Sequence, residues 1–133
     1  MELHEMEGIG PTHAATLQSL GLTTTDHLLE HGASRAGPEA LAEKSGIRED
    51  LLLEWVNHAD LCRLDGVAGE YAHLLEAAGV DSVPELAQHN AANLTVALEH
   101  TNYTKHLVRR VPSESESFRW IEQARGLPRA VHH

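Results

Sequence analysis

The sequence has little cysteine, few aromatic residues and no long apolar run. A single cysteine, Cys62, cannot form an internal disulfide, and only five of the 133 residues are Phe, Trp or Tyr. No apolar stretch approaches the roughly 18 residues that a membrane-spanning helix needs. The segment 1–7 lacks the positive start and apolar core of a secretory signal. These absences predict a cytoplasmic protein with a reduced thiol and no membrane partner.

Basic residues are also scarce. The chain has 10 Lys+Arg against 20 Asp+Glu, which gives a formal charge of -10 at pH 7. Residues 1–104 hold four basic and seventeen acidic side chains, whereas residues 105–133 hold six basic and three acidic ones. The overall charge opposes unaided attraction to nucleic acid or anionic lipid. The basic tail has two interpretations: charge complementarity within the molecule, or a basic contact site.

No segment alternates apolar and polar residues as a strand would, and the pattern predicts an all-α chain. The length allows one ordinary domain or two small units that share a core. A helix is expected at about 49–64, where apolar residues follow helical spacing. Others are expected from Asn90 through Leu98, at about 102–110 and from Ser113 to Gly126. The predicted core comprises Leu17, Leu20, Leu28, Leu52, Trp55, Leu74, Leu75, Leu86, Leu98, Phe118, Trp120 and Ile121.

A repeat with an offset of 58 residues organises the chain. The segments 8–22 and 66–80 align without gaps, so that Gly8 pairs with Gly66 and Gly21 with Gly79. A repeat of this size indicates a supersecondary unit that is used twice. Each unit reads as a helix, a tight turn at the second glycine and a short second helix. The predicted division is a first unit with a bridging helix at 1–64, and a second unit with the C-terminal helices at 65–133.

Helix starts and ends are signalled at several positions. Pro11 suits the first turn of a helix, where its missing N–H is not needed. Thr24 or Thr25 is expected to cap the second helix of the first unit, and Ser82 caps its counterpart as part of a capping box with Glu85. The segment Ser113-Glu-Ser-Glu116 is a second capping box.

Gly8-Ile-Gly10, followed by Ala14 and Leu17, resembles the helix-hairpin-helix pattern. The resemblance implies tandem helix-hairpin-helix-like (SAM-like) units packed as one compact domain. In that family, main-chain N–H groups at the hairpin bind a DNA phosphate, which here implies the hairpin residues Gly8, Ile9, Gly10, Gly66, Val67 and Gly69. The second turn departs from the pattern, because Ala68 stands where the first has Gly10.

The whole chain also looks like a bacterial family of uncharacterised, helix-hairpin-helix-related proteins, a domain of unknown function. The segments that carry this resemblance are 53–61 (LEWVNHADL) and 108–112 (VRRVP). It implies the fold and brings no established activity.

The charges near the turns favour a protein partner over DNA. The first turn is flanked by Glu2, Glu5 and Glu7, and no basic residue precedes Arg35. Phosphate binding normally gains its affinity from positive neighbours. The function expected is therefore a non-catalytic adaptor that binds an unidentified protein, as a monomer or weak homodimer. The alternative is weak DNA-backbone binding through the turns, supported by Arg63, Lys105, Arg109 and Arg110.

The sequence contains no convincing catalytic set. His27-Leu-Leu-Glu-His31 matches the zinc-protease pattern H-x-x-E-H, but the second unit has Glu85 where the first has His27, so surface histidines are expected. Cys62 is expected to be a buried, inert thiol, and His58 a partly buried hydrogen-bonding residue. The prediction is no enzyme, no metal and no cofactor.

Overall fold

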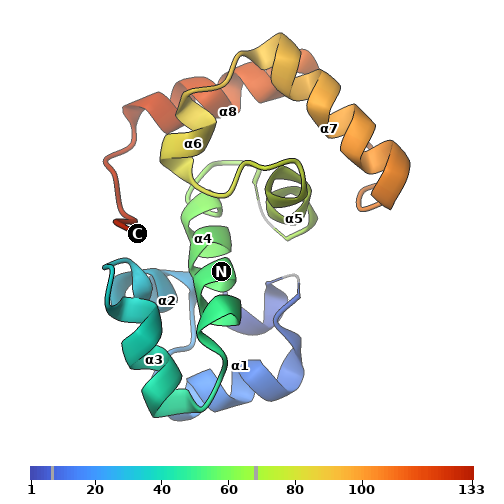
Figure 1. Ribbon diagram of the computed structural model, residues 1–133. Helices are drawn as coiled ribbons and strands as arrows, with labels where there is room; N and C mark the ends of the chain where they lie inside the picture. The colour runs from blue at the N-terminus through green and yellow to red at the C-terminus, as the bar shows by residue number, and fades with distance from the viewer. Residues whose placement is uncertain (7, 68) are drawn as a thin grey trace.

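The computed structural model describes residues 1–6, 8–67 and 69–133. Within them the chain is all-helical, as predicted, and an isolated bridge between Glu2 and Thr24 is the single extended pairing there. None of these helices is long and apolar enough to cross a membrane. The elements (Figure 1) are a 3₁₀ helix at Leu3–Glu5, α1 (Gly10–Ser19), α2 (Thr25–Gly32), α3 (Gly37–Ser45), α4 (Glu49–Leu61), α5 (Glu70–Ala77), α6 (Val83–Ala87), α7 (Ala91–Lys105) and α8 (Glu114–Gly126).

The apolar side chains gather in two clusters, and α4 contributes to both. The first cluster is formed by residues from Leu3 to Ala59 together with Val131, and the second by residues from Leu61 to Ala124. In Figure 1, α1 to α3 surround one end of α4, while α7 and α8 form an arch beyond the other end. Helix α7 packs on α5, and α8 packs on both α6 and α7. The helix predicted at about 49–64 is therefore confirmed, although it ends at Leu61.

The ends of α1 and α5 have the same backbone geometry, 58 residues apart. The N–H of Leu22 donates to the carbonyl of Leu17 at 3.0 Å, and the N–H of Val80 donates to that of Leu75 at 2.8 Å. The intervening Gly21 and Gly79 have φ of 87° and 92°. An L residue rarely adopts this left-handed conformation, so glycine is required at both positions.

The side-chain caps of the short second helices also correspond. The N–H of His27 donates to Oγ1 of Thr24 at 3.1 Å, and that of Glu85 donates to Oγ of Ser82 at 3.3 Å. Each hydroxyl accepts one of the N–H groups that a helix start leaves without an internal partner. The capping box at Ser113 and Glu116 is formed as predicted.

The separate helix predicted at about 102–110 is wrong. Helix α7 runs without a break to Lys105 and ends at His106, which has a left-handed φ of 52°. The side chain of Asn102 does not start a new helix. Its Oδ1 accepts the N–H groups of Leu107 and Val108 at 2.8 and 2.9 Å. The amide thus holds the loop that follows α7, a role that a helix-start pattern does not distinguish from capping.

Two of the twelve predicted core residues are wrong. Leu20 is 40% exposed and Phe118 is 55% exposed, whereas the other ten are buried. Leu20 is the C-cap of α1, where the backbone turns away from the core. In α8 the buried positions are Ser117, Trp120, Ile121 and Ala124. Phe118 lies about 100° around the helix from Ser117, so its side chain points outward.

The C-terminal tail returns to the first cluster. Val131 is buried there beside residues from α1 to α4. The N–H of His132 donates to the carbonyl of Ala33 at 2.8 Å, and a ring nitrogen of His133 lies 2.7 Å from the carbonyl of Gly32. The tail therefore connects the end of α8 with the end of α2, as Figure 1 shows.

Candidate functional site

The first glycine turn lies directly before α1. Gly8 and Gly10 have φ of 87° and 72°, and the side chain of Ile9 between them is buried. Helix α1 has no side-chain cap, and Pro11 removes one of its first N–H donors. A Cβ placed on Gly8 or Gly10 would meet nothing within 4 Å, so the turn is open on its outer side.

The second turn is partly covered by α8. Gly66 and Gly69 have φ of 83° and 48°, and Val67 is buried. A Cβ on Gly66 would lie 3.4 Å from the indole nitrogen of Trp120. The N–H of Asp65 donates to the side chain of Gln123 at 3.0 Å. This turn is therefore shaped by packing as well as by its glycines. Glu7 and Ala68, which the sequence analysis placed at the two turns, lie outside the described residues.

Two of the four predicted supporting cations are held by carboxylates. Nε of Arg63 donates to the buried Asp60 at 2.9 Å. The guanidinium of Arg110 donates to both carboxylate oxygens of Glu116, at 2.6 and 3.0 Å. This pairing, with the capping contacts to Ser113, lowers the pKa of Glu116 to about 2. The other two, Lys105 and Arg109, are exposed.

The structure brings two arginines near the second turn. The hydroxyl of Tyr71, the second residue of α5, donates to the backbone carbonyl of Arg110 at 3.0 Å. Arg119 lines a hollow of about 260 Å³ together with Gly66, but Asp65 and Glu116 line the same hollow. The surroundings of this turn are therefore mixed in charge.

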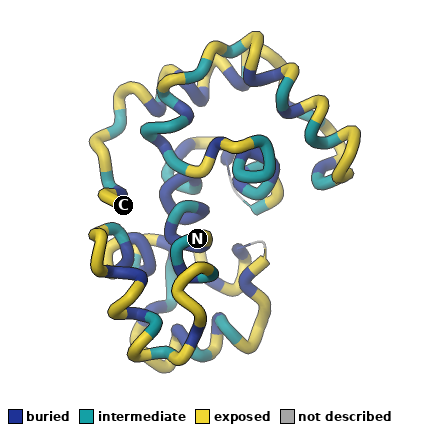
Figure 2. The backbone as a smooth tube through the Cα atoms, viewed as in Figure 1, coloured by how far each residue is buried: buried dark blue, intermediate teal, exposed yellow. Residues whose placement is uncertain are grey.

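An apolar surface that the sequence analysis missed lies on the outside of α7 and α8. Ala91, Ala92, Phe118 and Ile121 line a hollow of about 290 Å³ between the two helices. Val96, four residues after Ala92 and therefore on the same face of α7, is 65% exposed. We call Ala92, Val96 and Phe118 the α7–α8 surface. The outer faces of both helices are largely exposed in Figure 2.

The rim of this hollow is mainly acidic. Glu114 and Glu122 line it, with Arg125 as the one side chain of permanent positive charge. Arg125 donates to Glu122 at 2.7 Å and to the carbonyl of Ala87 at 3.1 Å, so its charge is already engaged. The sequence spacing alone did not separate this surface from the core, because Phe118 stands three residues before Ile121, as a core residue could.

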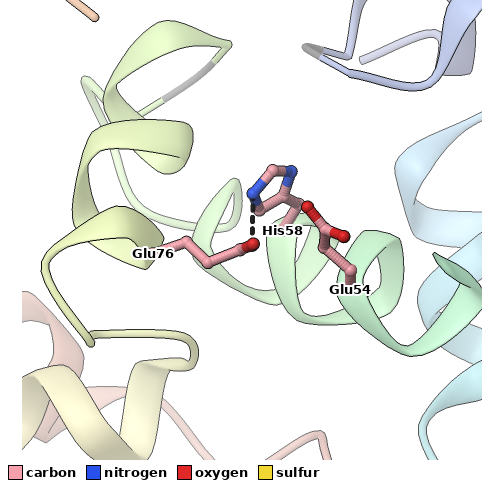
Figure 3. A group of neighbouring side chains, drawn as sticks. All are labelled: Glu54, His58 and Glu76. Atoms are coloured by element: carbon pink, nitrogen blue, oxygen red, sulfur yellow. Dashed lines mark ion pairs between the residues drawn. The ribbon is translucent and has the colours of Figure 1, made fainter. Parts of the chain in front are cut away.

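A second candidate site joins α4 to α5. Glu54 and His58 lie one turn apart on α4, and Glu76 approaches them from α5 (Figure 3). One ligand atom from each of the three side chains lies within 4.8 Å of the others. His58 is 2% exposed, and its Nε2 contacts a carboxylate oxygen of Glu76 without the alignment of a hydrogen bond.

The two carboxyl groups of this site differ in proton affinity. Burial raises the pKa of Glu54, and both the hydrogen bond and the charge of Glu76 raise it further. Burial alone would also raise the pKa of Glu76, but its contact with His58, together with smaller contributions from Glu54 and His73, lowers it. His73 lies one turn before Glu76, and its ring centroid is 5.9 Å from that of His58.

The other candidate groups do not form a site. Nδ1 of His27 lies 3.3 Å from both the backbone nitrogen and the hydroxyl of Thr23, and His31 is exposed. This H-x-x-E-H segment forms no metal-binding group within the described part of the chain. Cys62 is half-buried, and burial raises the pKa of its thiol, which disfavours the reactive thiolate.

Comparisons with known proteins place the chain in a family by its sequence. No curated protein and no solved structure matches it. The sequence pattern of one family matches residues 7–127, which include both glycine turns, the Glu54–His58–Glu76 cluster and all of α8. The chain belongs to this family, which is described as a domain of unknown function (DUF4332).

Proposed function

We propose that the protein is a non-catalytic, cytoplasmic adaptor of the helix-hairpin-helix type that binds a basic amphipathic segment of another protein on the α7–α8 surface. The observation that carries the proposal is the exposure of Val96 and Phe118 beside a hollow with an acidic rim. An amphipathic helix that docks in a groove places a few apolar side chains in it. Lysines or arginines beside them would meet Glu114, since Glu122 is already paired with Arg125.

The charge of the whole chain supports the same partner. At a formal charge of -10, the protein attracts cationic segments and repels anionic ones over a distance of about 8–10 Å at physiological salt. The apolar contact supplies most of the affinity, since rim charges chiefly change the association rate. Binding should therefore weaken with salt but persist at high salt.

The test uses a defined probe. A fluorescent helical peptide with leucines along one face and lysines elsewhere should bind in a polarisation titration, and its glutamate counterpart should not. Val96→Asp with Phe118→Asp should weaken binding at least tenfold. Both side chains are exposed, so the variant should keep the circular dichroism spectrum of the wild type. Leu20→Asp, at the exposed C-cap of α1 and away from α7 and α8, is the matched control. Equal binding of both peptides, or of wild type and the Val96/Phe118 variant, would refute the proposal.

Binding to the DNA backbone is the second candidate. It is favoured by the open first turn, where α1 begins without a side-chain cap and offers N–H groups at a helix start. Fluorescent duplex DNA at about 50 mM salt separates the candidates. The adaptor proposal predicts no binding at tens of micromolar protein. Micromolar binding that falls steeply with salt and is lost on Arg109→Glu with Arg110→Glu would favour DNA.

A further inference from the structure

We propose that Glu54, His58 and Glu76 bind one divalent cation of the zinc class and so join α4 to α5. No metal was predicted from the sequence, in which Glu76 stands 18 residues after His58 and nothing shows that the three side chains meet. The fold brings one nitrogen and two carboxylates within 4.8 Å of one another. Figure 3 shows all three side chains converging between the two helices.

The distances are close to those of a bound ion. Zinc bonds to imidazole nitrogen and carboxylate oxygen are about 2.0–2.2 Å long, so ligands of one ion lie roughly 3–4 Å apart. His58 and Glu76 are already in contact. Glu54 is exposed, and a small rotation of its flexible side chain completes the set.

The donor types select the class of cation. Imidazole suits zinc, nickel, copper and iron, whereas calcium and magnesium prefer oxygen ligands alone. Three protein ligands leave at least one position for water in a four-coordinate ion. That position would face the hollow of about 250 Å³ lined by Glu54 and Glu76.

The hollow beside the cluster has an acidic lining. Asp50 and Asp81 also line the hollow, and its lining includes no Lys or Arg. A divalent cation held between Glu54 and Glu76 would balance both of their charges.

A buried imidazole nitrogen gives further support. Nε2 of His58 is shielded from solvent and, although it contacts Glu76, it makes no aligned hydrogen bond among the described residues. Buried polar atoms are normally hydrogen-bonded. Since His58 is 2% exposed, packing holds its ring in place before any ion arrives. An ion on its Nε2 would satisfy the nitrogen that already points into the cluster.

The experiment is a zinc titration of chelator-treated protein prepared without an added histidine tag. A chromophoric competitor measures the affinity, and a thermal unfolding scan measures the stabilisation. We expect one Zn²⁺ per chain and a higher melting temperature. Glu54→Gln and Glu76→Gln should each weaken binding by about tenfold or more. Glu99→Gln, an exposed glutamate on α7, is the control and should bind like the wild type.

Variants of histidines outside the cluster test whether zinc binds elsewhere on the chain. His27→Gln with His31→Gln, and His132→Gln with His133→Gln, should leave the affinity unchanged. If zinc is lost in either of these variants and retained in Glu54→Gln, the ion binds adventitiously and the proposal is wrong. Absence of stoichiometric binding to the wild type would also overturn it. These results do not depend on the α7–α8 surface.

Discussion

Asp60 is a buried carboxylate that connects three parts of the molecule. Its Oδ2 accepts the N–H of Val83, at the start of α6, at 2.7 Å. Its Oδ1 accepts Nε of Arg63 at 2.9 Å, and Nη1 of Arg63 donates to the carbonyl of Pro128 at 3.0 Å. Asp60 therefore holds the end of α4 to the start of α6 and, through Arg63, to the C-terminal tail.

Replacing Asp60 with alanine removes both acceptors from a site that water does not reach. Loss of one partner from a buried ion pair costs about 3–5 kcal/mol. A domain of this size unfolds with a total free energy of about 5–15 kcal/mol, so Asp60→Ala should remove at least about a fifth of it. Arg63→Ala should cost less, because Asp60 keeps the N–H of Val83 and the positive end of α6.

Urea unfolding followed by far-UV circular dichroism measures these changes. With a denaturant slope of about 1–3 kcal/mol per molar urea, the midpoint of Asp60→Ala should fall by at least about 1 M. A double-mutant cycle should give a coupling of about 1–3 kcal/mol between Asp60 and Arg63. Asp60→Leu with Arg63→Met should recover part of the loss, since it leaves no charge buried alone. A cost below about 1 kcal/mol for Asp60→Ala, with additive single changes, would refute this reasoning.

Two further predictions concern backbone packing and pH. A Cβ on Gly37 would lie 2.8 Å from backbone atoms of Gly32, so Gly37→Ala should destabilise the fold by about 1–3 kcal/mol. Gly126→Ala meets nothing within 4 Å and should shift the melting temperature little; equal shifts would contradict the prediction. The folded-state pKa of Glu116 is about 2, below its ordinary value of 4.5, because of Arg110. Its stabilisation is therefore present above pH 4.5 and is lost as pH falls towards 2. Urea midpoints should show that Glu116→Gln is less stable than wild type at neutral pH and that this difference shrinks in acid; a constant difference would contradict this.

The helix starts were predictable because their signals are local. Thr24, Ser82, Asn90 and Ser113 each accept the N–H of the residue three positions later. The chemistry of these caps depends on neighbours in sequence, so a single sequence contains it. The same holds for Gly21 and its counterpart Gly79, which end their helices.

The incorrect predictions concern positions whose environment depends on packing against residues that are distant in the sequence. The helical spacing in α8 allowed the side chain of Phe118 to face inward or outward. The packing of α8 against α7 places it outward. Asn102 has the side chain of a helix cap, yet its partners follow it in the loop. A local pattern does not distinguish these cases, since both satisfy the same propensities.

The candidate sites were partly beyond sequence reasoning for the same reason. The turn glycines could be found in the sequence, because a backbone with positive φ favours glycine at those positions. The cluster of Glu54, His58 and Glu76 depends on how α4 meets α5. Within each helix alone, His and Glu stand three or four residues apart, which is a common spacing. The spacing indicates a site only once the packing of the two helices is known.

The tail gives the chain a second crossing between its two apolar clusters. Helix α4 is the first, and the strap from Leu127 to His133, with Val131 as its anchor, is the second. Two groups of helices joined by one helix could rotate about that helix. A second connection prevents this rotation unless one of the two connections is released. Rotation of α7 and α8 relative to α2 therefore requires Val131 to leave the first apolar cluster. Removing that side chain would leave the contacts of His132 with Ala33 and of His133 with Gly32 to hold this second connection.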